Sequence, residues 1–254
     1  MNGATGVMAI ILAETAVGAS VLLFASGVWG VVRRGFFLLT GVTVALCAAG
    51  AWAITASEAT GAAGSRAVTA LGVFTSVAVV WQVLLLVRQE RLARGVGVAA
   101  SVAGGVALVL LAGVRERAFA LGAVELVLGA LFLGSTAYGL LLGHWYLVER
   151  RLTKRYMVHS SYLYGAGVVA AAVATVIASR SPAPDIGNLS PLLAVPSFTL
   201  LLAGGFVAIC ALIAPFVWKL ANEGGRSIQA ATGYFYLAVI MAFSAEMAAK
   251  LRFF

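Results

Sequence analysis

The chain is a succession of long apolar runs separated by short polar turns. Eight runs reach about 20 residues, the length that an α-helix needs to cross the hydrocarbon core of a bilayer. The pattern therefore predicts an all-α bundle of about eight transmembrane helices, which form a single integral membrane domain over residues 1–254. The predicted helices are 6–32, 36–56, 67–87, 95–114, 119–148, 156–178, 192–218 and 228–249.

The composition agrees with a membrane location. Hydrophobic residues make up 62% of the chain and charged residues only 10%, whereas soluble domains carry about 25% charged residues. The net charge of +8 comes from cations clustered in the turns, without the interleaved aromatic residues of a nucleic-acid groove. We therefore expect lipid, and no nucleic acid, around this chain. Cys47 and Cys210 lie far apart inside apolar runs, which predicts two core residues and no thiolate metal site.

The basic residues predict the orientation in the membrane. If successive turns alternate between the two sides, one side carries eleven cations and the other side six. Loops rich in Lys and Arg face the cytoplasm, so the first set is predicted inside and both termini outside. We expect a multi-pass protein of the cytoplasmic (inner) membrane of a prokaryote. The set predicted inside comprises Arg33, Arg34, Arg88, Arg91, Arg94, Arg150, Arg151, Lys154, Arg155, Lys219 and Arg226, and the set predicted outside comprises Arg66, Arg115, Arg117, Arg180, Lys250 and Arg252.

A short pattern in the first apolar run recurs in the fifth run. The pattern predicts two four-helix halves with the same orientation, an arrangement known among membrane folds. The matching residues are Glu14, Gly18 and Ala19 with Glu125, Gly129 and Ala130, at a constant offset of 111 positions.

Three acidic residues, Glu14, Glu125 and Glu246, lie inside predicted spans. A charge at the bilayer centre costs at least about 2.5–3.5 kcal/mol, so each side chain is expected to face the bundle interior, a cavity or a partner subunit. One interpretation is that the acids bind a proton, gate a proton path or face a quinone head group. The other is that they are hydrogen-bonded carboxyls that lock the packing of the helices.

The histidines, His144 and His159, flank the basic turn between the fifth and sixth runs. Three roles are open for them. They are axial ligands of one b-type haem, they bind and protonate a quinone with help from Tyr146, Tyr156 or Tyr162, or they belong to an aromatic belt at the membrane surface.

Several familiar signatures are missing from the sequence. It contains no P-loop, HExxH, GxSxG or Rossmann glycine pattern, and no extramembrane segment long enough to hold a soluble catalytic domain. No lysine lies in the middle of a span, where a retinal Schiff base would need it, and no filter-like Gly-Tyr-Gly loop indicates an ion channel.

The last apolar run, AVIMAFSAEMAAKLRFF, and the first, AETAVGASVLLF, resemble stretches in the membrane anchors of polysulfide and dimethyl sulfoxide reductases. The last run carries an acid and then a base one turn later, as that family often does, at Glu246 and Lys250. The first run is similar to the family's opening helix. The resemblance implies a subunit without its own metal that oxidises or reduces quinone and exchanges electrons with an iron–sulfur protein on the outer face. The three acids lie on the side that this implies, and the histidines do not.

The leading hypothesis is a membrane subunit of a respiratory or electron-transfer complex that anchors partner subunits and exchanges electrons and protons with quinone. Such a chain is part of an oxidoreductase complex rather than an enzyme by itself. The alternatives are a small transporter or proton-conducting protein that uses the intramembrane acids, and an assembly subunit without chemistry.

The orientation is testable by labelling with a membrane-impermeant maleimide in cells. A Thr153→Cys variant should react only after permeabilisation, because the turn at 149–155 is predicted to be cytoplasmic. A Ser181→Cys variant should react in intact cells, because its loop is predicted outside. The native cysteines lie in apolar runs and provide the unlabelled background. The reverse pattern would invert every assignment of side.

Overall fold

In a computed structural model that describes residues 3–115, 118–149, 151–180 and 198–251, the chain forms eight long α-helices and one short 3-10 helix, η1. All eight are long and apolar enough to cross a membrane, and the described ranges contain no strand. The predicted all-α polytopic bundle is confirmed. The elements are α1 (Gly3–Ala25), α2 (Arg34–Glu58), α3 (Gly61–Leu86), α4 (Glu90–Leu111), η1 (Ala112–Val114), α5 (Phe119–Val148), α6 (Arg155–Ser179), α7 (Phe198–Glu223) and α8 (Ser227–Lys250).

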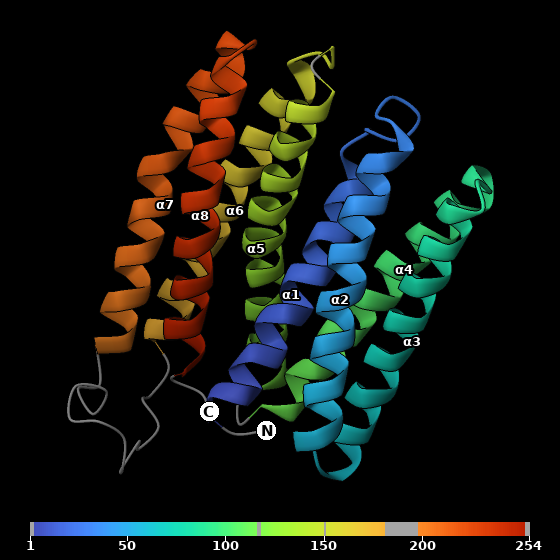
Figure 1. Cartoon of the computed structure of the whole chain (residues 1–254). Helices are drawn as coiled ribbons and strands as arrows, with labels where there is room; N and C mark the ends of the chain where they lie inside the picture. The colour runs from blue at the N-terminus through green and yellow to red at the C-terminus, as the bar shows by residue number, and fades with distance from the viewer. Residues whose placement is uncertain (1–2, 116–117, 150, 181–197, 252–254) are drawn as a thin grey trace.

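The helices form two groups of four, α1–α4 and α5–α8 (Figure 1). Within each group consecutive helices pack together and the first helix also packs against the fourth. The two groups meet mainly through α1 and α5, which run in the same direction (Figure 1). These two helices are central, since 78% and 72% of their most apolar stretches are buried, against 28–44% in the other six.

Small residues bring α1 and α5 close together. A Cβ atom added to Gly18 would overlap the carbonyl oxygen of Ala130, and one added to Gly134 would overlap the backbone of Gly18. In lipid no hydrophobic force joins two helices, so such close backbone packing supplies the attraction between them. The contact between the two halves therefore depends on residues without large side chains.

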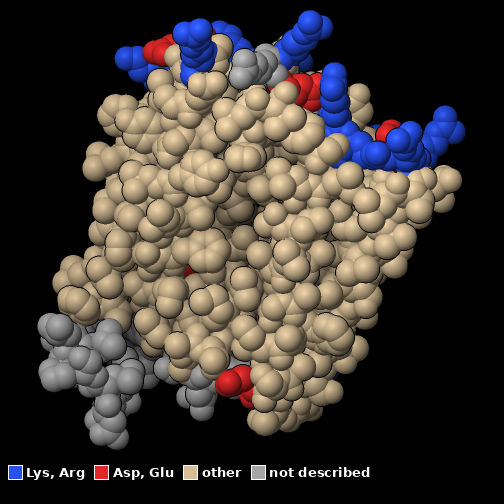
Figure 2. Space-filling view, viewed as in Figure 1, with Lys and Arg blue, Asp and Glu red and all other residues tan. Residues whose placement is uncertain are grey.

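The outer helices present large apolar side chains to their surroundings. Leu46, Leu86, Leu201 and Leu212 are each at least 65% exposed, and Figure 2 shows a broad apolar surface between the two ends, with only a small trace of an acidic side chain visible in it. Lys and Arg side chains gather at one end of the bundle (Figure 2), where the even-numbered helices begin. This surface is compatible with contact to lipid hydrocarbon. The basic side chains lie at one end of it.

The first helix ends about two turns earlier than predicted. It was expected to reach Val32 but ends at Ala25, because Gly27 and Gly30 adopt left-handed backbone with φ of 70° and 82°. The apolar residues that follow fold back as a packed turn, in which Trp29 stacks on Phe24 at a centroid distance of 5.4 Å. The residues after Ala25 are therefore still apolar, but they are no longer helical.

The seventh helix also differs from its predicted bounds. It continues past the expected end at Trp218 to Glu223, with Pro215 inside it. Neighbouring helices and local adjustments satisfy the backbone groups that a proline frees, so membrane helices tolerate it. The predicted start at Leu192 and the proline-containing loop before it lie outside the described residues.

The central contact is testable with Gly18→Ala. The added methyl group meets backbone of α5 and forces α1 away, so we expect a loss of about 1–3 kcal/mol in the free energy of unfolding. Gly105→Ala in α4 is the matched control, because its added Cβ would meet nothing within 4 Å. The measurement is thermal or denaturant unfolding in detergent. Equal stability of the two variants would contradict the close α1–α5 contact.

Candidate functional site

The three predicted acids are buried in the same region of the bundle. Glu14 is fully buried, and Glu125 and Glu246 are each 6% exposed. They come from α1, α5 and α8, so both halves contribute. Two cations join them, Arg115 just after η1 and Lys250 at the end of α8, which are 5% and 4% exposed. We call these five side chains the acid–base cluster.

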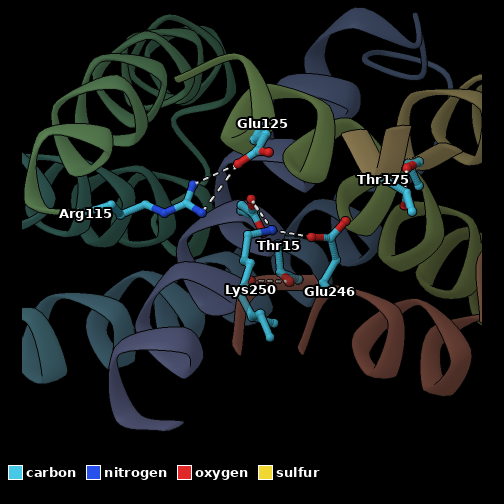
Figure 3. Close-up of polar contacts among 9 residues, drawn as sticks. Thr15, Arg115, Glu125, Thr175, Glu246 and Lys250 are labelled. Atoms are coloured by element: carbon cyan, nitrogen blue, oxygen red, sulfur yellow. Dashed lines mark hydrogen bonds and ion pairs between the residues drawn. The ribbon is translucent and has the colours of Figure 1, made fainter. Parts of the chain in front are cut away.

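Lys250 connects α8 to α1. Its Nζ lies 2.8 Å from Oε1 of Glu14 and also pairs with the carboxylate of Glu246, one turn earlier in the same helix. Figure 3 shows Lys250 reaching toward Glu246, with a dashed line between the two groups. One ammonium group therefore forms ion pairs with two carboxylates, which come from opposite halves of the protein.

Arg115 neutralises the third acid. Both terminal guanidinium nitrogens lie 3.4 Å from Oε2 of Glu125, and the two side chains point toward each other in Figure 3. The short η1 helix carries the chain from α4 to this position. The guanidinium is an always-charged partner for a carboxylate.

Arg115 and Lys250 were counted among the turn cations of the outer side, but neither is a solvent-exposed turn residue. Both are ion-paired inside the bundle. Among the described residues, Arg66 and Arg180 are the members of that set that remain exposed. The difference in exposed positive charge between the two ends is therefore larger than predicted. A detectable signal was the spacing of Glu246 and Lys250, which places them on one helix face.

The position of Glu14 depends on a glycine of α5. A Cβ atom at Gly129 would overlap the Glu14 carboxylate, so only glycine leaves space for the acid at this point. The other carboxylate oxygen, Oε2, has no hydrogen-bond partner among the described residues. Buried polar atoms are nearly always satisfied by protein, water or a proton. If Glu14 were ionised, Oε2 would carry negative charge without a hydrogen bond from the described residues.

A small cavity adjoins the cluster on the side of the second half. Glu125, Thr175, Glu246 and Lys250 line it together with alanines of α6 and α8 and Val207 of α7. Its volume of about 20 Å³ is enough for about one water molecule. A quinone ring does not fit such a space. The chemistry that the geometry allows at the cluster is therefore binding of a proton or water.

The other predicted residues lie near the basic end, away from this cluster. His144 is exposed on α5 and its Nδ1 lies 3.1 Å from the hydroxyl of Tyr236 on α8. His159 and Tyr162 are exposed and line a groove beside the turn that follows α1. The two histidines thus have different surroundings. In the part of the chain that is described, no three His, Cys, Asp or Glu side chains gather as a metal site would require.

Tyr146 stabilises the turn between α5 and α6. Its ring is 6% exposed, its hydroxyl donates to the carbonyl of Thr153 at 2.5 Å, and it accepts the N–H of Met157 at 3.3 Å. These contacts hold the turn between α5 and α6. Tyr146 was predicted to act with the histidines, but it does not line the groove that contains His159.

No protein-family model, curated protein or solved structure matches the chain. The resemblance to the reductase membrane anchors remains a prediction from the two stretches that carry it. The assignment of function must therefore come from the geometry of the cluster.

The cluster is testable by removing its shared cation. Lys250→Met leaves two buried carboxyls without their ammonium partner, so we expect a loss of about 3–5 kcal/mol in the free energy of unfolding at neutral pH. Lys219→Met, at an exposed lysine, should change little. Thermal unfolding in detergent provides the measurement.

A double-mutant cycle separates charge from packing in this prediction. Glu14→Gln removes one of the two carboxylates, so Lys250→Met should cost less in that background than in the wild type. If the two losses simply add, Lys250 stabilises the bundle by packing and the ion pairs contribute little.

Proposed function

We propose that this membrane protein binds and releases protons at the acid–base cluster and acts as a proton-conducting or proton-coupled transport protein. The observation that carries the proposal is the burial of three carboxyls from both halves of the bundle, two of which, Glu14 and Glu246, share the single ammonium group of Lys250. Each ionisable group in such a position costs free energy unless it is paired or neutralised.

The charge balance of the cluster favours a bound proton. If Glu14, Glu246 and Lys250 were all ionised, these three linked groups would carry one net negative charge in a buried site. One proton on a carboxyl removes that charge, and the unsatisfied Oε2 of Glu14 is a position where it would sit without losing a hydrogen bond. The proton would be shared among groups that Lys250 already links.

The surroundings of the cluster favour exchange of that proton. The cavity beside Glu125 and Glu246 has room for a water molecule, which would pass a proton to or from a carboxyl. The cluster lies where α1 of one half meets α5 and α8 of the other. A relative movement of the halves would change the distances between cations and carboxylates, as in transporters built from two repeats.

A second candidate is the electron-transfer subunit expected from the resemblance. The observation that favours it is that Glu246 and Lys250, the residues that carry the resemblance, form an ion pair and reach Glu14. Such a subunit would anchor partners, including an iron–sulfur protein, in the inner membrane of a prokaryote. A quinone would exchange protons through the cluster and would bind outside the water-sized cavity.

Proton movement is testable in liposomes that contain the purified protein and an internal pH-sensitive dye. With a potassium gradient and valinomycin as the driving force, the wild type should change the internal pH. Glu246→Gln should slow this change about 100-fold, the lower part of the range for a positioned proton-transfer group. Glu90→Gln, at an exposed acid of α4, should match the wild type.

The same preparation distinguishes the two candidates. If the protein alone moves no protons but co-purifies with redox subunits in mild detergent, and Glu125→Gln slows quinol oxidation by that complex, the electron-transfer candidate is correct. If glutamine at all three acidic positions changes neither activity, the cluster is a packing element and both candidates fail.

A further inference from the structure

A groove opens at the basic end of the bundle, between the turn after α1 and the beginning of α6. It has a volume of about 460 Å³, and its lining includes Ser26, Gly27, Arg155, Tyr156, His159 and Tyr162. The acid–base cluster described above contributes nothing to it. Pockets of this size accommodate small molecules or lipid head groups.

The early end of α1 shapes one wall of the groove. Because α1 stops at Ala25 and Gly27 turns the chain with a φ of 70°, helix does not occupy the space beside α6. The wall is held in place by Ser26, whose Oγ accepts the hydroxyl of Tyr138 at 2.9 Å and donates to the carbonyl of Leu23 at 3.1 Å. The groove is therefore part of the folded bundle.

The opposite wall carries the groups that would bind an anion. Arg155 and His159 are four residues apart on α6 and face the groove together with the phenols of Tyr156 and Tyr162. Arg155 and His159 are both exposed, and no acidic side chain in the described part of the chain forms a salt bridge with Arg155. Its charge is available to a ligand.

An apolar path continues from the groove along α6. Exposed residues recur at spacings of three or four, so they form one stripe on the outer face of the helix. The stripe from Tyr162 to Val176 is about 21 Å long at 1.5 Å per residue, longer than one leaflet's hydrocarbon half of about 15 Å. A second shallow groove, lined by Val169, Val173 and Val176, lies on it. The stripe comprises His159, Tyr162, Ala166, Val169, Val173 and Val176.

We propose that this groove binds an anionic phospholipid from the leaflet at the basic end. The phosphate contacts Arg155 and His159, the phenols of Tyr156 and Tyr162 donate hydrogen bonds, and an acyl chain lies along the α6 stripe. Basic pockets between transmembrane helices at the membrane surface bind such head groups. Tyrosine is enriched at the interface between membrane and water. A quinone head group is neutral, so it could accept hydrogen bonds from the arginine but would form no ion pair with it.

Binding is testable by native mass spectrometry of the full chain in detergent, titrated with phosphatidylglycerol, phosphatidylcholine or a short-chain quinone. The wild type should retain phosphatidylglycerol in preference to phosphatidylcholine. Arg155→Gln should weaken phosphatidylglycerol binding about fivefold, the loss expected for one basic residue near an anionic lipid. Arg91→Gln, at an exposed arginine of α4 outside the groove, should bind as the wild type does.

Two further measurements distinguish a loss of charge from a loss of folding. Arg155→Lys keeps the charge and should retain most of the affinity, and unchanged thermal unfolding of all variants shows that the fold is intact. Equal binding of the two phospholipids, equal losses in Arg155→Gln and Arg91→Gln, or preferential binding of the quinone would each overturn the proposal. The last result would assign the groove to a quinone.

Discussion

The requirement that buried charge be neutralised governs the interior of this protein. The interior of the bundle is closely packed and has room for little water, so a carboxylate there needs a cation, a hydrogen-bond donor or a proton. Lys250 serves Glu14 and Glu246, and Arg115 serves Glu125. These pairs join α1, α5, α8 and the segment after α4, so the same interactions that neutralise charge also connect the two halves.

The close contact of α1 with α5 makes this arrangement possible. Gly18 and Gly134 let the two backbones approach, and Gly129 leaves space for the Glu14 carboxylate. Gly18 and Gly129 were expected to be equivalent positions of a repeat, yet one contacts backbone and the other contacts an acid. The two halves share the same pattern of helix packing, but their chemistry at the interface differs.

The two ends of the bundle have different electrostatics. At the basic end, ion pairs such as Arg33 with Glu149, at 3.1 Å, are open to solvent on the arginine side and contribute little to stability. At the other end, Arg115 and Lys250 are buried in the interior, and Arg66 and Arg180 are the exposed cations among the described residues. One end therefore presents positive charge to lipid head groups, while the acid–base cluster, in the half of the bundle near the opposite end, keeps its charge inside the protein.

The eight spans could be predicted from the apolar runs alone, because the thickness of the hydrocarbon core sets a minimum length for a spanning helix and each run reaches it. It also identified Glu14, Glu125 and Glu246, since any acid in a span is costly enough to require a reason. Which cations pair with these acids became clear only from the folded bundle. Arg115 and Lys250 look like turn charges along the chain, and their burial depends on contacts between distant segments. Hydropathy also could not predict three other features, because they depend on side-chain packing and backbone conformation. These are the end of α1, the separation of the two histidines and the contacts of Tyr146 in the turn between α5 and α6.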